Sequence, residues 1–138
     1  MNALATATAV VLAALAALHV FWGIRGGSAS SSFVPEAGGK PLFRPRPVDC
    51  FVVAAALAAA AFLVLSARGL VASPLPPSWT RAGTTAVGAA FVLRSIGEFR
   101  YAGFFKRVRG TRFARLDTLV FSPLCLALGL AGLAVAWL

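Results

Sequence analysis

The sequence has few charged side chains, and acidic ones are the rarest. Charged residues make up 12% of its 138 residues and only 4 of these are Asp or Glu, whereas 59% of the chain is hydrophobic. So few charges exclude a disordered chain and an ordinary water-soluble domain. The composition therefore predicts an integral membrane protein, with no length left over for a soluble catalytic domain.

Residues that carry common cofactor and catalytic chemistry are also scarce. The chain has one His and two Cys residues, so a haem held by two histidines is excluded. One His with one nearby Cys also falls short of the usual ligand spacing of a metal site. The sequence has no CxxC, GxSxG, P-loop or dinucleotide-binding motif. It predicts no metal and no cofactor, and it leaves open whether the protein is an enzyme.

The apolar residues lie in four long segments. A bilayer core about 30 Å thick takes roughly 20 helical residues per crossing. The third segment is the least apolar, because its uncharged part runs only from Ala82 to Leu93, and we expect its helix to continue to Tyr101. The expected fold is an all-α, integral membrane four-helix bundle that forms a single domain. Its four spans are expected at about residues 3–24, 48–66, 80–101 and 117–138.

The connections between these segments differ strongly in charge. Of the 13 Lys and Arg residues, four lie in residues 25–47, six in residues 100–116 and two in residues 67–81. Because Lys and Arg concentrate in cytosolic loops, the first and third connections are predicted in the cytosol and both termini outside it. No Lys or Arg precedes the first apolar segment, so we expect a span there rather than a cleaved signal peptide.

The location that follows is a bacterial cytoplasmic (inner) membrane, crossed several times. The chain uses eleven Arg against two Lys and is rich in Ala and Gly, which is typical of a GC-rich bacterial genome. This argument rests on codon bias rather than on physics. Small residues spaced four apart, such as Ala127 and Ala131, permit close helix packing or self-association into a homo-oligomer.

The third connection mixes aromatic and basic side chains. Such a mixture can bind single-stranded nucleic acid, but between two spans it favours a membrane surface, where rings lie at headgroup level and cations reach lipid phosphates. We expect anionic headgroups of the bilayer as the partner, and no nucleic acid. The basic residues expected at this surface are Arg100, Lys106, Arg107, Arg109, Arg112 and Arg115. The first connection, residues 25–47, is either a mobile tether or a segment of which part lies back on the bundle or on the lipid surface.

Several polar residues fall in the cytosolic half of the expected bundle. Ionisable groups inside a membrane are costly and usually have a function. Arg94 and Glu98 are four residues apart on one helical face, so they can pair; Asp117 is the alternative partner of Arg94. Together these residues could line a cavity for a small polar or amphiphilic ligand, or a proton-handling site. The candidate set is His19, Trp22, Arg94, Glu98, Tyr101, Asp117, Ser122 and Cys125.

Each of these residues also has a purely structural interpretation. The Arg94 pair would then only fix the register of two helices, and His19 would donate to a backbone carbonyl. Asp117 would cap the fourth span, and Cys125 would be a small packing residue. Cys50 and Cys125 lie at different depths of the expected bundle, which predicts two reduced thiols rather than a disulfide.

Three sequence blocks resemble those of a known family. They are HVFWG at residues 19–23, RSIGEFRYAGFFKRVRGTRFARLDT at residues 94–118 and FSPLC at residues 121–125. In order and spacing they resemble the small bacterial four-span membrane proteins grouped as domain of unknown function 3995. The resemblance implies a four-helix integral membrane protein and supplies no activity, cofactor or catalytic residue.

Three functions remain open from the sequence. The first is a membrane protein that binds a lipid, a small amphiphile or a membrane partner through the cytosolic-side cavity. The second is a small oligomeric proton-coupled transporter. The third is a membrane enzyme acting on a lipid or quinone-like substrate, with His19 as the base and Arg94 holding an anionic group.

Overall fold

The computed structural model describes residues 1–27 and 33–138, and nearly all of its regular structure is helical. Helix α5 continues a short α-helix, α4 (Arg112–Leu116), and a π-helical turn, η2 (Asp117–Phe121). Strands β1 (Glu36–Ala37) and β2 (Lys40–Pro41) pair antiparallel in a small hairpin. The all-α prediction is confirmed. The four long helices are α1 (Asn2–Ile24), α2 (Pro47–Ser66), α3 (Pro77–Ile96) and α5 (Ser122–Trp137).

Within residues 1–27 and 33–138, three helices are long and apolar enough to cross a membrane. They are Asn2–Ile24, Pro47–Ser66 and the continuous run Arg112–Trp137. Helix α3 also has 20 residues, but Arg81 and Arg94 make it less apolar. This agrees with the sequence, in which the third segment is the least hydrophobic.

Two predicted helix boundaries were wrong. Helix α3 ends at Ile96 rather than at Tyr101, because Gly97 adopts a positive φ of 87° and turns the chain away. The last helix begins at Arg112 rather than at residue 117. It starts early because the Thr111 hydroxyl accepts a hydrogen bond of 3.0 Å from the Ala114 N–H, as an N-cap residue does.

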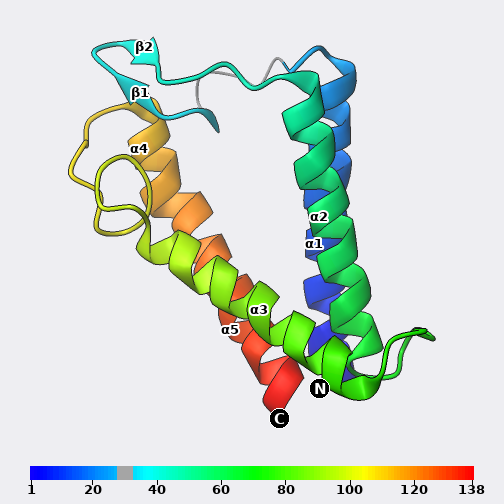
Figure 1. The fold of residues 1–138 in the computed structure, drawn as a ribbon. Coiled ribbons are helices and arrows are strands. Elements are labelled where there is room, and N and C mark those ends of the chain that lie inside the picture. The colour runs from blue at the N-terminus through cyan, green and yellow to red at the C-terminus, as the bar shows by residue number, and fades with distance from the viewer. Residues whose placement is uncertain (28–32) are drawn as a thin grey trace.

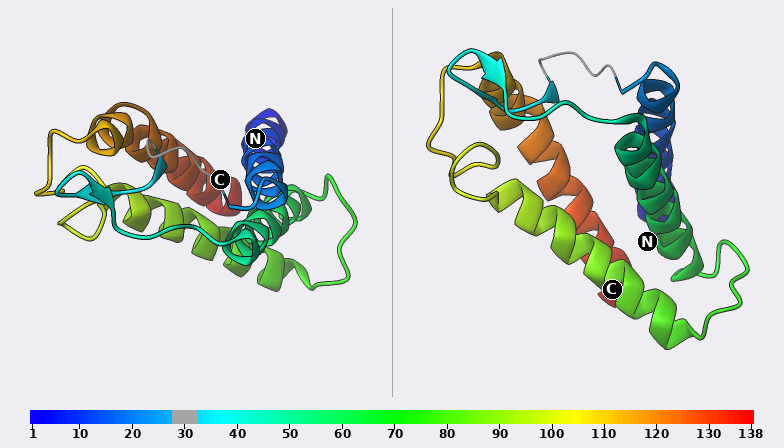
Figure 2. Two further views of the ribbon diagram at one scale, coloured as in Figure 1. Left: turned by 90° about the horizontal axis from the view of Figure 1, so that it is seen from above. Right: turned by 45° about the horizontal axis from the view of Figure 1, so that its top comes forward.

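The long helices form two pairs arranged as a V. Helices α1 and α2 lie side by side, as do α3 and α5, and the pairs converge near both termini and diverge toward the other end (Figures 1 and 2). The largest fully buried side chains, Leu12, Val64 and Val135, come from α1, α2 and α5. The core therefore closes one end of the V and leaves the other end open.

Glycines allow α3 and α5 to cross at very short range. A Cβ atom built on Gly88 would lie 2.9 Å from both the Gly129 carbonyl oxygen and the Leu133 backbone nitrogen. A Cβ on Gly129 would lie 2.8 Å from the Val92 nitrogen. Only hydrogen fits at these positions, so the two backbones are in direct contact, as in close helix crossings within membranes.

The first connection spans the open end of the V. The β1–β2 hairpin lies near α4, and the chain then crosses to the start of α2 (Figure 1). The Phe33 ring lies 5.0 Å from the Trp22 ring on α1 and 5.7 Å from the Phe121 ring on η2. The part of this connection that the structure describes therefore contacts both helix pairs. Residues 28–32 lie outside the described residues.

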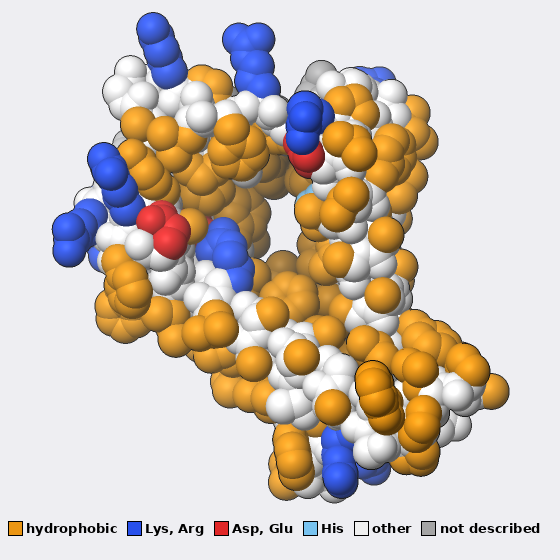
Figure 3. All heavy atoms as spheres, viewed as in Figure 1, with side chains coloured by type: hydrophobic (Ala, Val, Ile, Leu, Met, Phe, Trp, Pro, Cys, Tyr) orange, Lys and Arg blue, Asp and Glu red, His pale blue; other side chains and the backbone are white. Residues whose placement is uncertain are grey.

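Basic side chains gather at the open end. The connections that carry most of the Lys and Arg residues, residues 25–27, 33–46 and 97–111, lie there, and Figure 3 shows several basic side chains projecting outward at this end. Arg68 and Arg81 lie toward the end that holds the termini. We call the open end the cationic end.

Candidate functional site

A cleft separates the two helix pairs. It contains a cavity of about 340 Å³ with walls from all four long helices, including Leu15, Leu57, Phe91 and Leu124. The space-filling view shows the cleft as an opening between the pairs (Figure 3). The walls are mainly aliphatic and aromatic, which is typical of a ligand pocket with a few polar groups.

A second cavity of about 220 Å³ lies toward the cationic end. Its lining includes Asp49 and Cys50, and it shares four lining residues with the first cavity: His19, Trp22, Phe33 and Val53. The two cavities thus adjoin across these four side chains. They extend the cleft from Arg94 to the first turn of α2.

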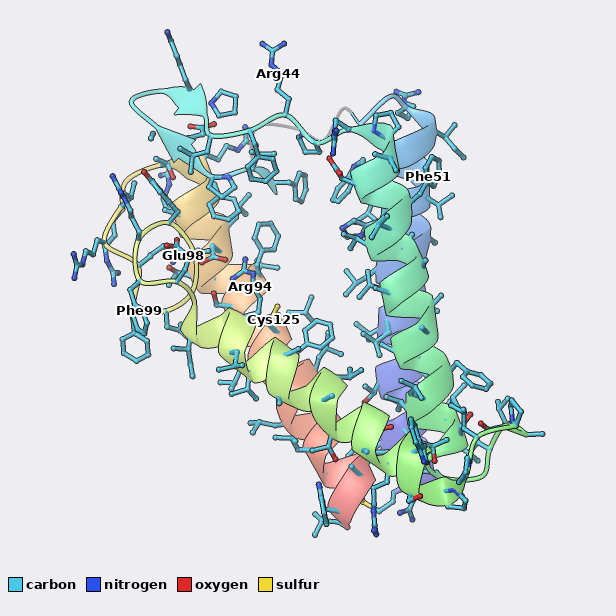
Figure 4. The ribbon with its side chains drawn as sticks, in the orientation of Figure 1. Arg44, Phe51, Arg94, Glu98, Phe99 and Cys125 are labelled. Carbon is cyan, nitrogen blue, oxygen red and sulfur yellow. The ribbon has the colours of Figure 1, made fainter. Side chains whose placement is uncertain are left out.

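Arg94 brings a positive charge into the apolar cleft. Its side chain points from the last turn of α3 into the space between the helix pairs, as does that of Cys125 (Figure 4). The Nη2 atom donates to Asp117 Oδ1 at 2.9 Å. The Nη1 atom is buried and has no hydrogen-bond partner among the described residues. Asp117 therefore holds the guanidinium on one side, while the Arg94 side chain as a whole is still 39% exposed.

Asp117 is the centre of a buried polar cluster behind Arg94. Its side chain is fully buried, and its Oδ2 accepts from Lys106 Nζ at 3.0 Å, from the Gly103 N–H at 2.7 Å and from Ser122 Oγ at 3.1 Å. With the Arg94 bond to Oδ1, the carboxylate accepts four hydrogen bonds. The cluster joins α3, the third connection and α5, and its two cations outnumber its one anion.

The π-helical turn places Asp117 in this cluster. Residues Asp117–Phe121 form one wide turn inside an otherwise α-helical segment, and such turns often mark functional sites. The turn offsets Asp117 from the regular α-helical register, and Ser122, five residues later, still bonds back to it.

His19 lines both cavities, with one nitrogen engaged. Its Nδ1 lies 2.8 Å from the Leu15 carbonyl oxygen. A carbonyl can only accept, so Nδ1 carries the proton and Nε2 of the neutral ring is the acceptor. The Trp22 ring packs edge-on against the imidazole, with centroids 5.1 Å apart.

Glu98 and Tyr101 lie outside the cleft. The Glu98 carboxylate is exposed and accepts from the backbone N–H groups of Arg100, Tyr101 and Ala102. The predicted Arg94–Glu98 pair was therefore wrong, and Arg94 has the alternative partner, Asp117. The reason is that the helix ends before Glu98, so the two residues no longer share a helical face.

Lys106 is a member of this cluster that the spacing of residues did not reveal. It was expected at the membrane surface, yet it is only 2% exposed and also donates to the Gly103 carbonyl and to Thr118 Oγ1. Asp117 is the acidic residue that follows the six cations of residues 100–116, which indicates that one of them pairs with it. The spacing alone does not say which cation this is. The other five basic residues of the third connection are exposed: Arg100, Arg107, Arg109, Arg112 and Arg115.

The structure thus brings four of the eight candidate residues to the cleft wall and two to the cluster behind it. His19, Trp22, Arg94 and Cys125 line the cavity, while Asp117 and Ser122 hold Arg94 in place. Within the described residues, no three His, Cys, Asp or Glu side chains gather as a metal site would need. Both cysteines are free thiols.

Comparison with known proteins gives one match. The family model described as "Protein of unknown function (DUF3995)" matches residues 12–132, which is most of the chain. No curated protein and no solved structure matches it.

Proposed function

For this chain, which belongs to the DUF3995 family of proteins of unknown function, we propose a role as a membrane protein that binds a lipid or a small amphiphile in the cleft between its helix pairs. It crosses a bacterial cytoplasmic membrane four times. The cationic end is cytosolic, and both termini are extracytosolic.

Four crossings are supported by helix length and by the position of Arg94. Helix α3 has 20 residues, which corresponds to about 30 Å of helix, the thickness of the hydrocarbon core. Of its two charges, Arg94, in the last turn, lines the cleft and pairs with Asp117 instead of facing outward. An intramembrane cation placed in this way is tolerated because its charge is partly matched.

The orientation is supported by the segregation of charge. Ten Lys and Arg residues lie at the cationic end, and two, Arg68 and Arg81, lie near the other end. The positive-inside rule places the richer side in the cytosol. Exposed rings of Phe99 and Phe105 beside these cations suit the headgroup region of anionic lipids.

Ligand binding is supported by one observation above the others, the apolar cleft with Arg94 and His19 on its wall. A bundle whose sole task is to anchor a chain would bring its helices together along their whole length. Here the pairs diverge, and Arg94 and His19 bring hydrogen-bonding groups to the wall of an otherwise apolar cavity. This combination suits a molecule with a polar head and an apolar body.

The binding proposal is tested by filling the cleft. Val53→Trp places a large ring on the wall shared by both cavities, whereas Val52→Trp adds the same ring at a neighbouring, 63% exposed position. Native mass spectrometry from mild detergent should show a co-purifying amphiphile on the parent and on Val52→Trp, and much less on Val53→Trp. Equal retention by both variants would contradict binding in the cleft.

The orientation is tested by cysteine labelling of intact cells. In a background of Cys50→Ser and Cys125→Ser, an impermeant maleimide should label Leu138→Cys and miss Gly110→Cys. The reverse pattern would overturn the proposed orientation.

A membrane enzyme acting on a lipid or quinone-like substrate is the second candidate. It is favoured by His19 and Arg94 lining the same cavity, with His19 Nε2 as the unprotonated nitrogen. In that case His19→Ala should retain the bound amphiphile and abolish its turnover. Loss of the amphiphile in His19→Ala would assign His19 to binding instead.

A further inference from the structure

We infer that the molecule in the cleft is a single-chain amphiphile with an anionic headgroup, which the guanidinium of Arg94 holds at the cleft wall. This inference rests on the proposed function and specifies the chemistry of its ligand. A carboxylate of a fatty acid and a phosphate of a lysolipid share this chemistry.

The charges at the cleft wall and in the cluster behind it do not balance. Arg94 and Lys106 carry two positive charges, and Asp117 supplies one negative charge. Glu98 is engaged with three backbone N–H groups, and Asp49 pairs with Arg46. One positive charge therefore remains at an apolar wall, where an uncompensated ion is unfavourable and a bound anion would neutralise it.

Arg94 is held in a fixed orientation at the wall of the cavity. Its Nη2 is fixed by Asp117 at 2.9 Å, and Asp117 is itself held by Ser122 and the Gly103 N–H. This support orients the guanidinium before any ligand arrives. The Arg94 side chain lines the cavity and is 39% exposed, so the oriented guanidinium is a preorganised partner for an anionic group in the cleft.

The size and lining of the cavity suit a single alkyl chain. The cavity beside Arg94 has a volume of about 340 Å³, at the small end of the range of about 300–1,000 Å³ for ligand pockets. Leu15, Leu57 and Leu124 line it with aliphatic side chains that suit an alkyl chain. A cavity of this size accommodates one chain more readily than two, and the opening between the helix pairs would let the chain enter from the lipid.

Trp22 provides a local probe of occupancy. It lines both cavities, whereas the other two tryptophans, Trp79 and Trp137, are 68% and 65% exposed. In a Trp79→Phe, Trp137→Phe background, fluorescence reports on Trp22 alone. Bromine-labelled stearic acid should quench it at lower concentration than the bromine-labelled alcohol of the same chain, which lacks the charge.

Substitution of Arg94 separates headgroup recognition from chain binding. Arg94→Gln should raise the half-quenching concentration of the labelled acid about tenfold, as expected for the loss of a charge-assisted hydrogen bond, and leave that of the alcohol unchanged. Arg94→Lys should retain most of the preference for the acid. Arg81→Gln is the matched control on the same helix and should change neither.

Each outcome bears on a different claim. If neither labelled compound quenches Trp22, the proposed amphiphile binding is wrong. If acid and alcohol quench equally, or if Arg94→Gln leaves the preference intact, the cleft binds amphiphiles but the inference about the headgroup is overturned. Should Arg94→Gln fail to fold, the comparison of acid with alcohol on the parent decides. Competition by unlabelled lysophosphatidic acid and by unlabelled stearic acid then shows whether phosphate or carboxylate is preferred.

Discussion

The guanidinium of Arg94 and the carboxylate of Asp117 meet at 2.9 Å although the two residues are 23 positions apart in the chain. This bond joins the end of α3 to the π-helical turn before α5. It also connects the cleft, where Arg94 lies, with the buried cluster that includes Lys106. One carboxylate therefore fixes the geometry of the cleft wall and the path of the third connection.

Asp117→Ala is expected to lower the free energy of unfolding strongly. It would leave Lys106 buried without its counterion, and removing one partner of a buried ion pair costs about 3–5 kcal/mol. Denaturation in mild detergent with increasing sodium dodecyl sulfate measures the change. Adding Lys106→Met to Asp117→Ala should recover part of the loss, because the uncompensated buried charge is then gone.

Asp49→Ala is the control for this prediction. It removes an acid from an ion pair with Arg46 in which both side chains are largely exposed, and such pairs contribute little to stability. Equal effects of Asp117→Ala and Asp49→Ala would show that the cluster around Asp117 does not stabilise the bundle.

Gly88→Ala is expected to weaken the α3–α5 pair. The added methyl would press against backbone atoms of Gly129 and Leu133 at 2.9 Å, which cannot move aside without separating the helices. Overpacking of this kind costs about 1–3 kcal/mol. Gly83→Ala on the same helix is the control, because its methyl would meet only the tip of Leu63, a flexible side chain, at 3.0 Å. A larger loss in Gly83→Ala than in Gly88→Ala would contradict the crossing geometry.

The long helices could be predicted because a helix that crosses a bilayer needs about 20 mainly apolar residues in succession. Uninterrupted apolar runs marked α1, α2 and the last helix, and the prolines at Pro47 and Pro77 stand in first turns, where a missing N–H is tolerated. The grouping of Lys and Arg into two connections likewise anticipated that those connections share one end of the molecule. An apolar run is a local pattern and the grouping of Lys and Arg is a simple count. A single sequence is therefore enough to show both.

The details of the cluster depended on interactions that spacing does not encode. Glu98 appeared to be a helical partner of Arg94, but Gly97 ends the helix and the carboxylate binds backbone N–H groups instead. Lys106 looked like any other surface cation, and only the return of the chain toward Asp117 buries it. The irregular backbone between α3 and α4 determines both the partners of Glu98 and the burial of Lys106. Its conformation cannot be inferred from the spacing of residues in the sequence.

Glu98→Ala is expected to loosen the turn that follows α3. The carboxylate satisfies three consecutive backbone N–H groups, and each hydrogen bond to a charged acceptor contributes about 1.5–3 kcal/mol. Losing even part of this should raise the rate of trypsin cleavage after Arg100 about tenfold. Glu36→Ala, which removes an acid from β1 at the same end of the molecule, should leave that rate unchanged. Unaltered cleavage in Glu98→Ala would show that the turn is held by other contacts.

Phe33→Ala is expected to uncouple the first connection from the helix pairs. The Phe33 ring lies 5.0 Å from Trp22 and 5.7 Å from Phe121, and each aromatic pair contributes about 0.5–1.5 kcal/mol beyond burial of its surface. Without this ring, water reaches the wall shared by the two cavities, so the emission of Trp22 should shift to longer wavelength. Leu42→Ala, at an exposed position of the same connection, should leave the emission in place. If Phe33→Ala also leaves it in place, the connection does not shield the cleft, and Trp22 is kept dry by α1 and α2 alone.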